Sequence, residues 1–341
     1  MDFINREKDI KYLNDHFESE PNSLLFVYGP KSSGKSTLLE KVARELDNTK
    51  YAVNFLDLRQ VIIYNFKTFL NVFFPKNIRN KAKDILNGFT INAGFFSVKM
   101  DEESILEENA FKIIVDKLAS AKQRGIQPII IIDEIQLLKH IYINGERHLI
   151  DELFNLFIAL TKVTHLCHIV LATSDSYFIE DIYNSAKLEK TSEFFLLDHF
   201  EKQDVDNWLE KESFKDQEIE TVWDYVGGCP WEIRQIIEKK KKGKSVKQTC
   251  IDFVDDKYGK ISEFRFSIDE KELKNEFDRI IKIIVEKGCY IRNDDENTKL
   301  VKKLLTGCIE LDIWFYIVNK HQIIANSKSI YHAFRKICQT R

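Results

Sequence analysis

A glycine-rich segment near the start of the chain carries the clearest chemical signal in the sequence. The residues from Gly29 to Thr37 read GPKSSGKST and fit the pattern G-x-x-x-x-G-K-[ST], whose backbone N–H groups cradle nucleotide phosphates. Lys35 of this P-loop can reach the β- and γ-phosphates, and the hydroxyl of Ser36 can coordinate Mg²⁺. We expect the whole segment to contact the nucleotide: Gly29, Pro30, Lys31, Ser32, Ser33, Gly34, Lys35, Ser36 and Thr37.

Two carboxylates follow a second apolar run. The segment from Ile129 to Gln136 reads IIIIDEIQ, which is typical of a buried strand that ends in acids and has the form of a Walker B motif. Asp133 would bind Mg²⁺ through a coordinated water, and Glu134 would polarise the water that attacks the γ-phosphate. The alternative is a buried strand whose acids simply reach solvent. The guanine-reading sequence NKxD is absent, so ATP and ADP are the expected nucleotides.

Hydroxyl groups end the next strand-like run, LATSDS, from Leu171 to Ser176. A glutamate directly after the Walker B aspartate resembles the additional-strand class of ATPases, which includes the AAA+ and STAND proteins. In that class a polar side chain lies between the two Walker motifs. We expect Ser174, or alternatively Thr173, to contact the γ-phosphate or the attacking water. Hydroxyls at strand ends also have purely local roles, which is the competing interpretation.

The elements that must position these residues alternate along the first two hundred residues. Strands are predicted at 24–28, 51–56, 129–132, 168–172 and 194–197, and helices at 6–17, 35–46, 105–122 and 149–164. This alternation predicts an α/β fold of the P-loop NTPase type with a parallel five-stranded sheet, similar to AAA+ proteins. Residues 60–104 interrupt it, and we expect a helical insertion there with a hairpin near 89–98.

Beyond Asp198 the pattern becomes helical. Helices are predicted at 201–211, 216–225 and 230–242; the GGCP sequence before the last one ends one helix at glycine and begins the next at Pro230. Two further helices (270–287 and 299–306), two alternating runs (313–318 and 322–325) and a helix from Ser327 are compatible with a winged helix. We therefore expect an ATPase domain (1–198), a helical lid (199–260) and a winged-helix-like domain (264–341).

Composition limits the partners of the protein. None of the apolar runs approaches the ~20 residues of a membrane helix, and the start of the chain is charged, so we expect a cytoplasmic protein without a membrane partner. The cysteines are scattered and do not form a zinc motif. Residues 239–341 carry a net charge of +8 and the remainder −11. This asymmetry favours an anionic partner such as DNA; the alternatives are a solvated lysine-rich surface and a protein partner.

Taken together, the motifs resemble the archaeal ATPase family, which is related to STAND signalling ATPases and to the origin-recognition ATPases within AAA+. The resemblance rests on FINRE (Phe3 to Glu7), GPKSSGKST, IIIIDEIQ, LATSDS and GGCP, and it spans roughly Phe3 to Arg234. It implies that Phe3, Ile4 and Arg6 border the adenine and that Pro230 touches the base from the lid. It also implies that Arg234 meets the γ-phosphate; the alternative is a surface arginine.

The sequence departs from the family pattern at one point. Family members often have an arginine shortly before the fifth strand, whereas residues 184–195 contain only the cations Lys187 and Lys190. A lysine is a poor substitute for a planar guanidinium. The sequence therefore predicts a slow, Mg²⁺-dependent ATPase that acts as a nucleotide-dependent conformational switch. Two alternatives remain: an ATP-regulated DNA-binding protein that uses its winged helix, and a protein-interaction scaffold with structural ADP or ATP.

Overall fold

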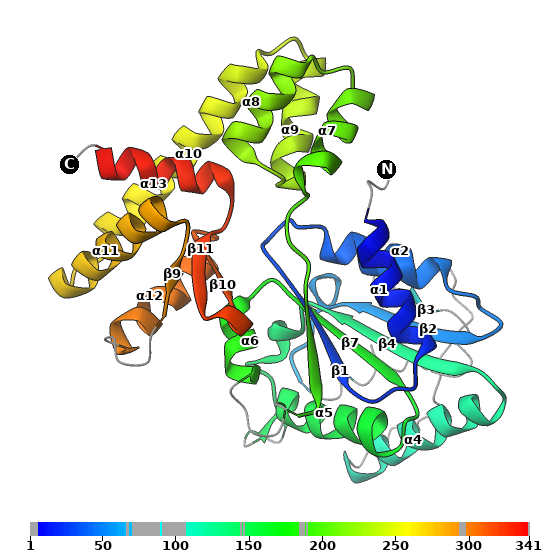
Figure 1. Cartoon of the computed structure of the whole chain (residues 1–341). Helices are drawn as coiled ribbons and strands as arrows, with labels where there is room; N and C mark the ends of the chain where they lie inside the picture. Colours follow the sequence, from blue (N-terminus) through cyan, green and yellow to red (C-terminus); the bar gives the residue numbers. More distant parts are fainter. Residues whose placement is uncertain are drawn as a thin grey trace.

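The computed structural model describes residues 6–65, 68–69, 89–90, 107–143, 145, 147–183, 188, 190–292 and 298–339. Its centre is a six-stranded sheet in the order β3-β2-β4-β7-β1-β8 (Figure 1). The strands are β1 (Leu24–Tyr28), β2 (Tyr51–Asp57), β3 (Phe89–Thr90), β4 (Gln127–Asp133), β7 (His168–Thr173) and β8 (Ser192–Leu196). Five strands run parallel and β3 pairs antiparallel to β2. The predicted α/β fold with a parallel five-stranded sheet is confirmed.

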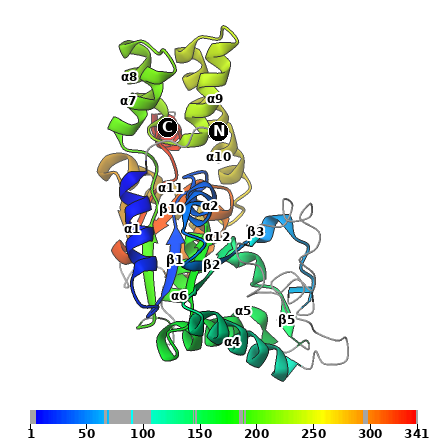
Figure 2. The same ribbon diagram turned by 90° about the vertical axis from the view of Figure 1, so that its right-hand side faces the viewer.

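Helices cover both faces of this sheet, which explains why its strands are so apolar. All residues of β1 and β7 are buried, as expected for central parallel strands. One face packs against α1 (Glu7–Glu18) and α2 (Lys35–Glu45). The other packs against α4 (Glu107–Gln123) and α5 (Leu149–Ile158), which continues in a π-helical turn (Ala159–Val163). Figure 2 shows α4 and α5 together beneath the sheet.

The register of the parallel strands brings their carboxyl ends to one edge. Tyr28 at the end of β1 lies opposite Thr173 of β7, and Asp133 at the end of β4 lies opposite Asp57 of β2. The segments that follow these strands therefore meet at the same edge, where ligands of open α/β sheets bind. Beyond β2, the short helix η1 (Leu58–Gln60) begins the interrupted region. Most of the expected insertion and hairpin lies outside the described residues.

The part of the chain after β8 forms two helical clusters joined by a long helix. The lid contains α7 (Lys202–Lys211), α8 (Asp216–Val226) and α9 (Pro230–Lys241), followed by α10 (Val246–Phe266). The tail contains α11 (Lys271–Lys287), α12 (Thr298–Glu310), α13 (Lys328–Gln339) and an antiparallel sheet of β9 (Tyr290–Ile291), β10 (Trp314–Ile317) and β11 (Gln322–Ala325). None of the helices in the described part of the chain is long and apolar enough to cross a membrane.

The sequence did not predict α10, α6 (Ser176–Tyr183) or β9. A two-stranded ladder of β5 (Tyr142–Ile143) and β6 (Arg147–His148) also follows β4. Helix α10 packs against both α8 and α13. Its buried residues follow one stripe, but apolar residues such as the exposed Phe266 lie outside it and weaken the helical pattern in the sequence. The helix also continues without a break through residues 260–264, between the expected lid and tail. The lid and the tail thus share one helix.

The tail packs directly on the carboxyl edge of the six-stranded sheet. The backbone N–H of Tyr316 in β10 donates to Ser176 Oγ at the start of α6, at 3.2 Å. The ring of Phe315 stacks near that of Tyr28, with centroids 6.2 Å apart, and Arg292 forms an ion pair with Glu180 of α6. Figure 1 shows β10 beside α6. Movement at this edge of the sheet can therefore reach the tail.

A buried histidine generates a prediction about acid stability. His168 begins β7, is 1% exposed and packs against the rings of His16 and Phe17. Burial lowers its pKa to about 3, whereas an unfolded histidine titrates near ~6.5. The unfolded state thus binds the additional proton between these values, and stability falls as the pH falls. At pH ~5.5 this one group should cost about 1.4 kcal/mol.

We expect His168→Phe to lose about 1.4 kcal/mol less stability than the wild type between pH ~7.5 and ~5.5, measured by urea denaturation. His140→Gln, at an exposed position, is the control for replacing a histidine. Equal losses in His168→Phe and the wild type would show that His168 does not drive the acid sensitivity.

Candidate nucleotide-binding site

The P-loop takes its shape from two glycines. Gly29 follows β1 and lies so close to the chain after β8 that a Cβ atom there would be 2.0 Å from the carbonyl oxygen of Leu197. Gly34 has a φ of 95° and precedes the first residue of α2, a left-handed conformation that glycine adopts without strain. The loop is therefore held against the sheet at one end and directed into the helix at the other, so that the positive end of α2 points at the site.

Lys35 lies inside this loop. Its Nζ donates to the carbonyl oxygens of Gly29 and Pro30, each at 2.9 Å, and only 5% of the residue is exposed. Burial lowers the pKa of Lys35 to about 8, while the carboxylates of Glu134 and Asp133 act in the opposite direction. The ammonium group is thus bonded to groups that phosphate oxygens can replace, at the position expected for phosphate binding.

The two carboxylates after β4 have different surroundings. Asp133 is fully buried, and burial raises its pKa. Glu134 has a φ of 58°, an unusual conformation for a glutamate and one often associated with functional sites. Its carboxylate accepts hydrogen bonds from Gln136 and, at 3.3 Å, from Ser174 Oγ. Thr173 instead donates to the Gln136 side chain at 2.7 Å. Of the two candidate hydroxyls, Ser174 is therefore the one in contact with Glu134.

An arginine that sequence reasoning missed joins these groups. Arg59 in η1 donates from Nη2 to Ser36 Oγ and to Asp133 Oδ2, both at 2.8 Å. Its Nε donates to Asp57 Oδ1 at 3.0 Å, and its Nη1 lies 3.4 Å from Glu134 Oε1. A signal was present in the sequence, since Asp57 and Arg59 directly follow a predicted parallel strand, whose carboxyl end must lie at the same edge.

The donor set at this edge fits a magnesium ion. Ser36 Oγ and Asp133 Oδ2 are both within hydrogen-bond distance of one positively charged nitrogen, so a hydroxyl and a carboxylate already face a common cation. Oxygen donors of this kind suit Mg²⁺, which is usually held by one or two protein ligands together with waters and phosphates. The part of the chain that the structure describes contains no cluster of three or more His, Cys, Asp or Glu side chains able to bind a metal.

The N-terminal segment reaches the back of the P-loop. Arg6 Nη2 donates to the carbonyl oxygens of Ser33 at 2.7 Å and Asp198 at 2.8 Å, and its guanidinium lies 4.5 Å from the Phe200 ring centroid. His199, which sequence reasoning also missed, is close to the same groups, and burial lowers its pKa to about 4. Arg6 thus joins the loop to the segment that leads to the lid. Phe3 and Ile4 lie outside the described residues, and an adenine contact of Arg6 stays a prediction.

The lid residues are less closely tied to the site. Pro230 is the first residue of α9. Arg234 lies one turn later, pairs with Glu238 on the same helix at 3.7 Å, and has a 40% exposed side chain. Their contacts with base and γ-phosphate stay predictions. The connection to the lid is fixed at Gly228, whose carbonyl accepts from the Phe200 N–H at 3.0 Å.

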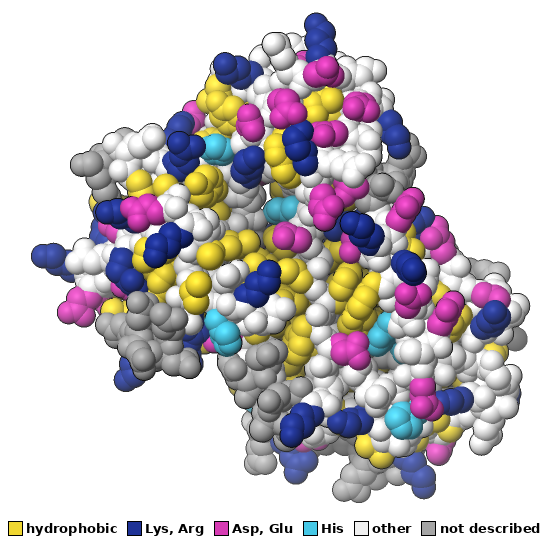
Figure 3. Space-filling view, in the orientation of Figure 1, with side chains coloured by type: hydrophobic (Ala, Val, Ile, Leu, Met, Phe, Trp, Pro, Cys, Tyr) yellow, Lys and Arg dark blue, Asp and Glu magenta, His cyan; other side chains and the backbone are white. Residues whose placement is uncertain are grey.

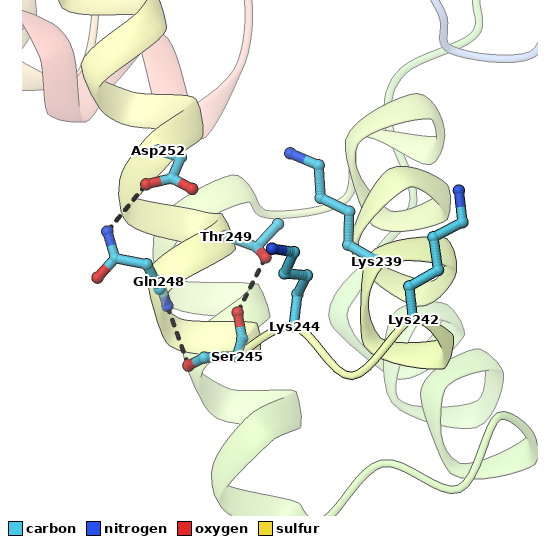
Figure 4. Close-up of a pocket in the computed structure, with 7 residues that line it drawn as sticks. All are labelled: Lys239, Lys242, Lys244, Ser245, Gln248, Thr249 and Asp252. Carbon is cyan, nitrogen blue, oxygen red and sulfur yellow. Dashed lines mark hydrogen bonds between the residues drawn. The ribbon is translucent and has the colours of Figure 1, made fainter.

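A separate basic pocket of about 350 Å³ lies at the far end of α9, where the chain turns into α10. Figure 4 shows Lys239, Lys242 and Lys244 around it, with Asp252 on the α10 side. The described residues that line it all belong to the lid, so it is distinct from the P-loop site. Its lysines begin the basic C-terminal region that the sequence indicated.

Known proteins are similar to this chain in sequence and in fold. Residues 3–236 match the model of an ATPase domain found predominantly in Archaea. Two uncharacterized ATP-binding proteins of Methanocaldococcus jannaschii are 37% and 38% identical to this chain; each comparison covers 99% of this chain, and 97% and 99% of the respective relatives.

Two solved structures resemble the fold. The Walker-type ATPase of Pyrococcus abyssi superimposes with a TM-score of 0.66 at 14% identity, covering 98% of this chain and 96% of that one. The ADP form of the Aeropyrum pernix ORC2 protein superimposes with a TM-score of 0.50 at 11% identity, covering 99% and 96%. These two structures share the fold; the match of the family model over residues 3–236 and the ATP-binding relatives show that the chain belongs to the archaeal ATPase family.

Proposed function

We propose that this protein binds Mg²⁺·ATP, hydrolyses it slowly and uses the nucleotide state to change the contacts of its lid and tail. The observation that carries the proposal is the charged cluster at the carboxyl edge of the sheet. In it Lys35, Ser36, Asp133 and Glu134 lie within reach of the same site, as the P-loop and Walker B motifs require. The ATP-binding relatives support the choice of nucleotide.

Each side chain then has a distinct role. The Lys35 ammonium would exchange its two carbonyl partners for phosphate oxygens, gaining charge-assisted bonds. Ser36 would hold Mg²⁺ directly and Asp133 would hold it through a water; when bound, the ion neutralises phosphate charge. Glu134 would accept the proton of the attacking water, and Ser174, which already donates to this carboxylate, would orient it.

Contacts between the P-loop and the tail support a switch. Lys31 Nζ in the P-loop lies 3.0 Å from Asp312 Oδ2, just before β10. Because Lys31 belongs to the loop that wraps the phosphates, bound nucleotide would compete with Asp312 for its ammonium group. The protein would then have two states, one with the Lys31–Asp312 contact formed and one with it broken. A nucleotide that binds these two states with different affinity shifts the balance between them, which is the requirement for a conformational switch.

The lid and the tail are coupled by a buried carboxylate. Glu232 of α9 is 1% exposed, accepts from Ser329 Oγ of α13 at 2.8 Å, and lies 3.6 Å from Lys257 Nζ of α10. A buried charge that loses its partners is costly, so these three helices should move together. Rearrangement at the P-loop would therefore displace lid and tail as one body.

DNA binding is the second candidate, favoured by one observation. Lys299, Lys302 and Lys303 are exposed on one side of α12, where they could meet phosphates together. Lys328, in contrast, lies over the Trp223 ring at 5.0 Å and is directed at the lid. Figure 3 shows basic side chains interspersed with acidic ones over the lid and tail, which is less typical of a DNA-binding face. A scaffold with structural nucleotide would instead show ATP or ADP retention without turnover.

Glu134→Gln should retain ATP but slow hydrolysis by about 10²-fold, because it removes the general base without changing the shape of the site. Single-turnover hydrolysis and calorimetric binding measure the two effects separately. Lys35→Ala is the comparison, since losing the phosphate-facing cation should abolish binding itself. If turnover falls by less than a few-fold in Glu134→Gln, Glu134 is not the general base. If Lys35→Ala binds ATP as tightly as the wild type, the P-loop is not the nucleotide-binding site.

Asp312→Asn should weaken the contact with Lys31 while preserving the left-handed backbone, which asparagine tolerates. Amide exchange in β10 should rise about two- to fivefold without nucleotide, as expected for loss of a surface ion pair. ATP should then cause little further change, whereas in the wild type it should produce the rise. Asp269→Asn, at an exposed position of the tail, is the control. An ATP response identical to that of the wild type would disconnect Asp312 from the switch.

Replacing Lys299, Lys302 and Lys303 by alanine tests the DNA alternative. If all three lysines contact DNA phosphates, the magnitude of the slope of the logarithm of the DNA-binding constant against log salt concentration should fall by about 2.7. The loss of affinity should be similar for every DNA sequence. ATP binding should be unchanged. Anisotropy titrations at several salt concentrations provide the measurement, with Lys8→Ala/Lys11→Ala on α1 as the control. Absence of binding at low salt in both nucleotide states would eliminate DNA as a partner.

A further inference from the structure

Arg59 occupies the place in the site where a metal ion would be needed. One nitrogen, Nη2, donates at 2.8 Å to each of the two proposed magnesium-binding side chains, Ser36 and Asp133. A cation that binds these oxygens must therefore displace this nitrogen. The guanidinium also provides the nearby positive charge that a fully buried Asp133 requires.

The same arginine has a second anchor, Asp57 at the end of the neighbouring strand β2. Asp57 Oδ1 accepts from both the backbone N–H and the Nε of Arg59, each at 3.0 Å. Gln60 Nε2 holds the other carboxylate oxygen of Asp57 at 2.9 Å. Asp57 is not one of the proposed magnesium ligands. The guanidinium can therefore leave Ser36 and Asp133 while its Nε remains bonded.

In the same arrangement Arg59 also faces the proposed general base. Its Nη1 is 3.4 Å from Glu134 Oε1, and the other Glu134 oxygen is held by Ser174 and Gln136. An arginine fork can bridge two carboxylates at once, which the single ammonium group of lysine cannot reproduce. The Asp57–Arg59–Glu134 chain would keep the Glu134 carboxylate in position after the metal has entered.

We propose that Arg59 is a positioning residue that competes with Mg²⁺ for Ser36 and Asp133 and, once displaced, holds Glu134 for hydrolysis. The inference rests on the proposed function, because it assigns Arg59 to the same metal and the same general base. It also offers a cationic side chain within the chain itself, where the family's usual arginine before the fifth strand is absent. Removing Arg59 should thus strengthen Mg²⁺ binding and at the same time slow ATP turnover.

Arg59→Gln tests both effects. Binding of a fluorescent ADP analogue is measured at increasing Mg²⁺, and the Mg²⁺ concentration for half-maximal strengthening should be at least threefold lower than in the wild type. Under saturating Mg²⁺·ATP, turnover should fall at least tenfold. Arg44→Gln, on the exposed side of α2, is the matched control and should change neither value.

Arg59→Lys extends the test and replaces Arg59→Gln if that variant fails to fold. Lysine retains the charge but loses the fork, so its Mg²⁺ midpoint should fall between those of wild type and Arg59→Gln, with turnover still reduced. If Arg59 had only a structural role, its replacement would weaken Mg²⁺ binding, which raises the Mg²⁺ midpoint, and would also slow turnover. A raised or unchanged Mg²⁺ midpoint in the folded variants would therefore overturn the proposal.

The two proposals fail in different ways. If the wild type binds ADP in an Mg²⁺-dependent manner but does not hydrolyse ATP, the proposed hydrolysis is wrong. A lowered Mg²⁺ midpoint in Arg59→Gln would still support competition between Arg59 and the metal. If the wild type hydrolyses ATP and Arg59→Gln hydrolyses it at the same rate, Arg59 does not position Glu134.

Discussion

Charge balance at the carboxyl edge of the sheet is the constraint on which the rest of the structure depends. Asp133 is fully buried there, with Asp57 and Glu134 beside it. Carboxylates cannot be gathered in a poorly solvated place without cations. Lys35 and Arg59 supply that charge, each held by several oxygens. The register of the strands, the turn of the P-loop and the short helix after β2 all serve to bring these groups together.

This balance has a consequence for nucleotide binding. Magnesium and phosphates add charges of both signs to a cluster that is already paired, so the existing bonds of Lys35 and Arg59 must be exchanged rather than simply supplemented. Such exchange can be transmitted because the surrounding parts are in contact with the cluster. The P-loop reaches the tail through Lys31 and Asp312, and the start of α6 reaches β10 through Ser176. The lid follows through α10, which it shares with the tail.

The sequence predicted local features well and features that depend on distant contacts poorly. The P-loop and the two Walker B acids are recognisable because their chemistry lies within a few consecutive residues, and the five parallel strands because buried strands are continuously apolar. Arg59 was missed because three of its partners come from two distant segments, Ser36 in α2 and the adjacent Asp133 and Glu134 at the end of β4. The choice between Thr173 and Ser174 depends on which side chain points toward Glu134, which a sequence does not record. Helix α10 was missed because apolar side chains outside its buried stripe, such as the exposed Phe266, weaken the helical periodicity of the sequence.

A crystal structure with Mg²⁺, ADP and beryllium fluoride is the most direct measurement of the central claim. The claim is that five side chains form one metal–nucleotide centre: Lys35, Ser36, Arg59, Asp133 and Glu134. We expect the metal ion to be bound to Ser36, with Asp133 contacting it through a water and Lys35 on the phosphate oxygens. Arg59 should have left Ser36 and Asp133 but remain bonded to Asp57 and Glu134. An Arg59 guanidinium still bonded to Ser36 and Asp133, with the nucleotide bound elsewhere or without metal, would contradict it.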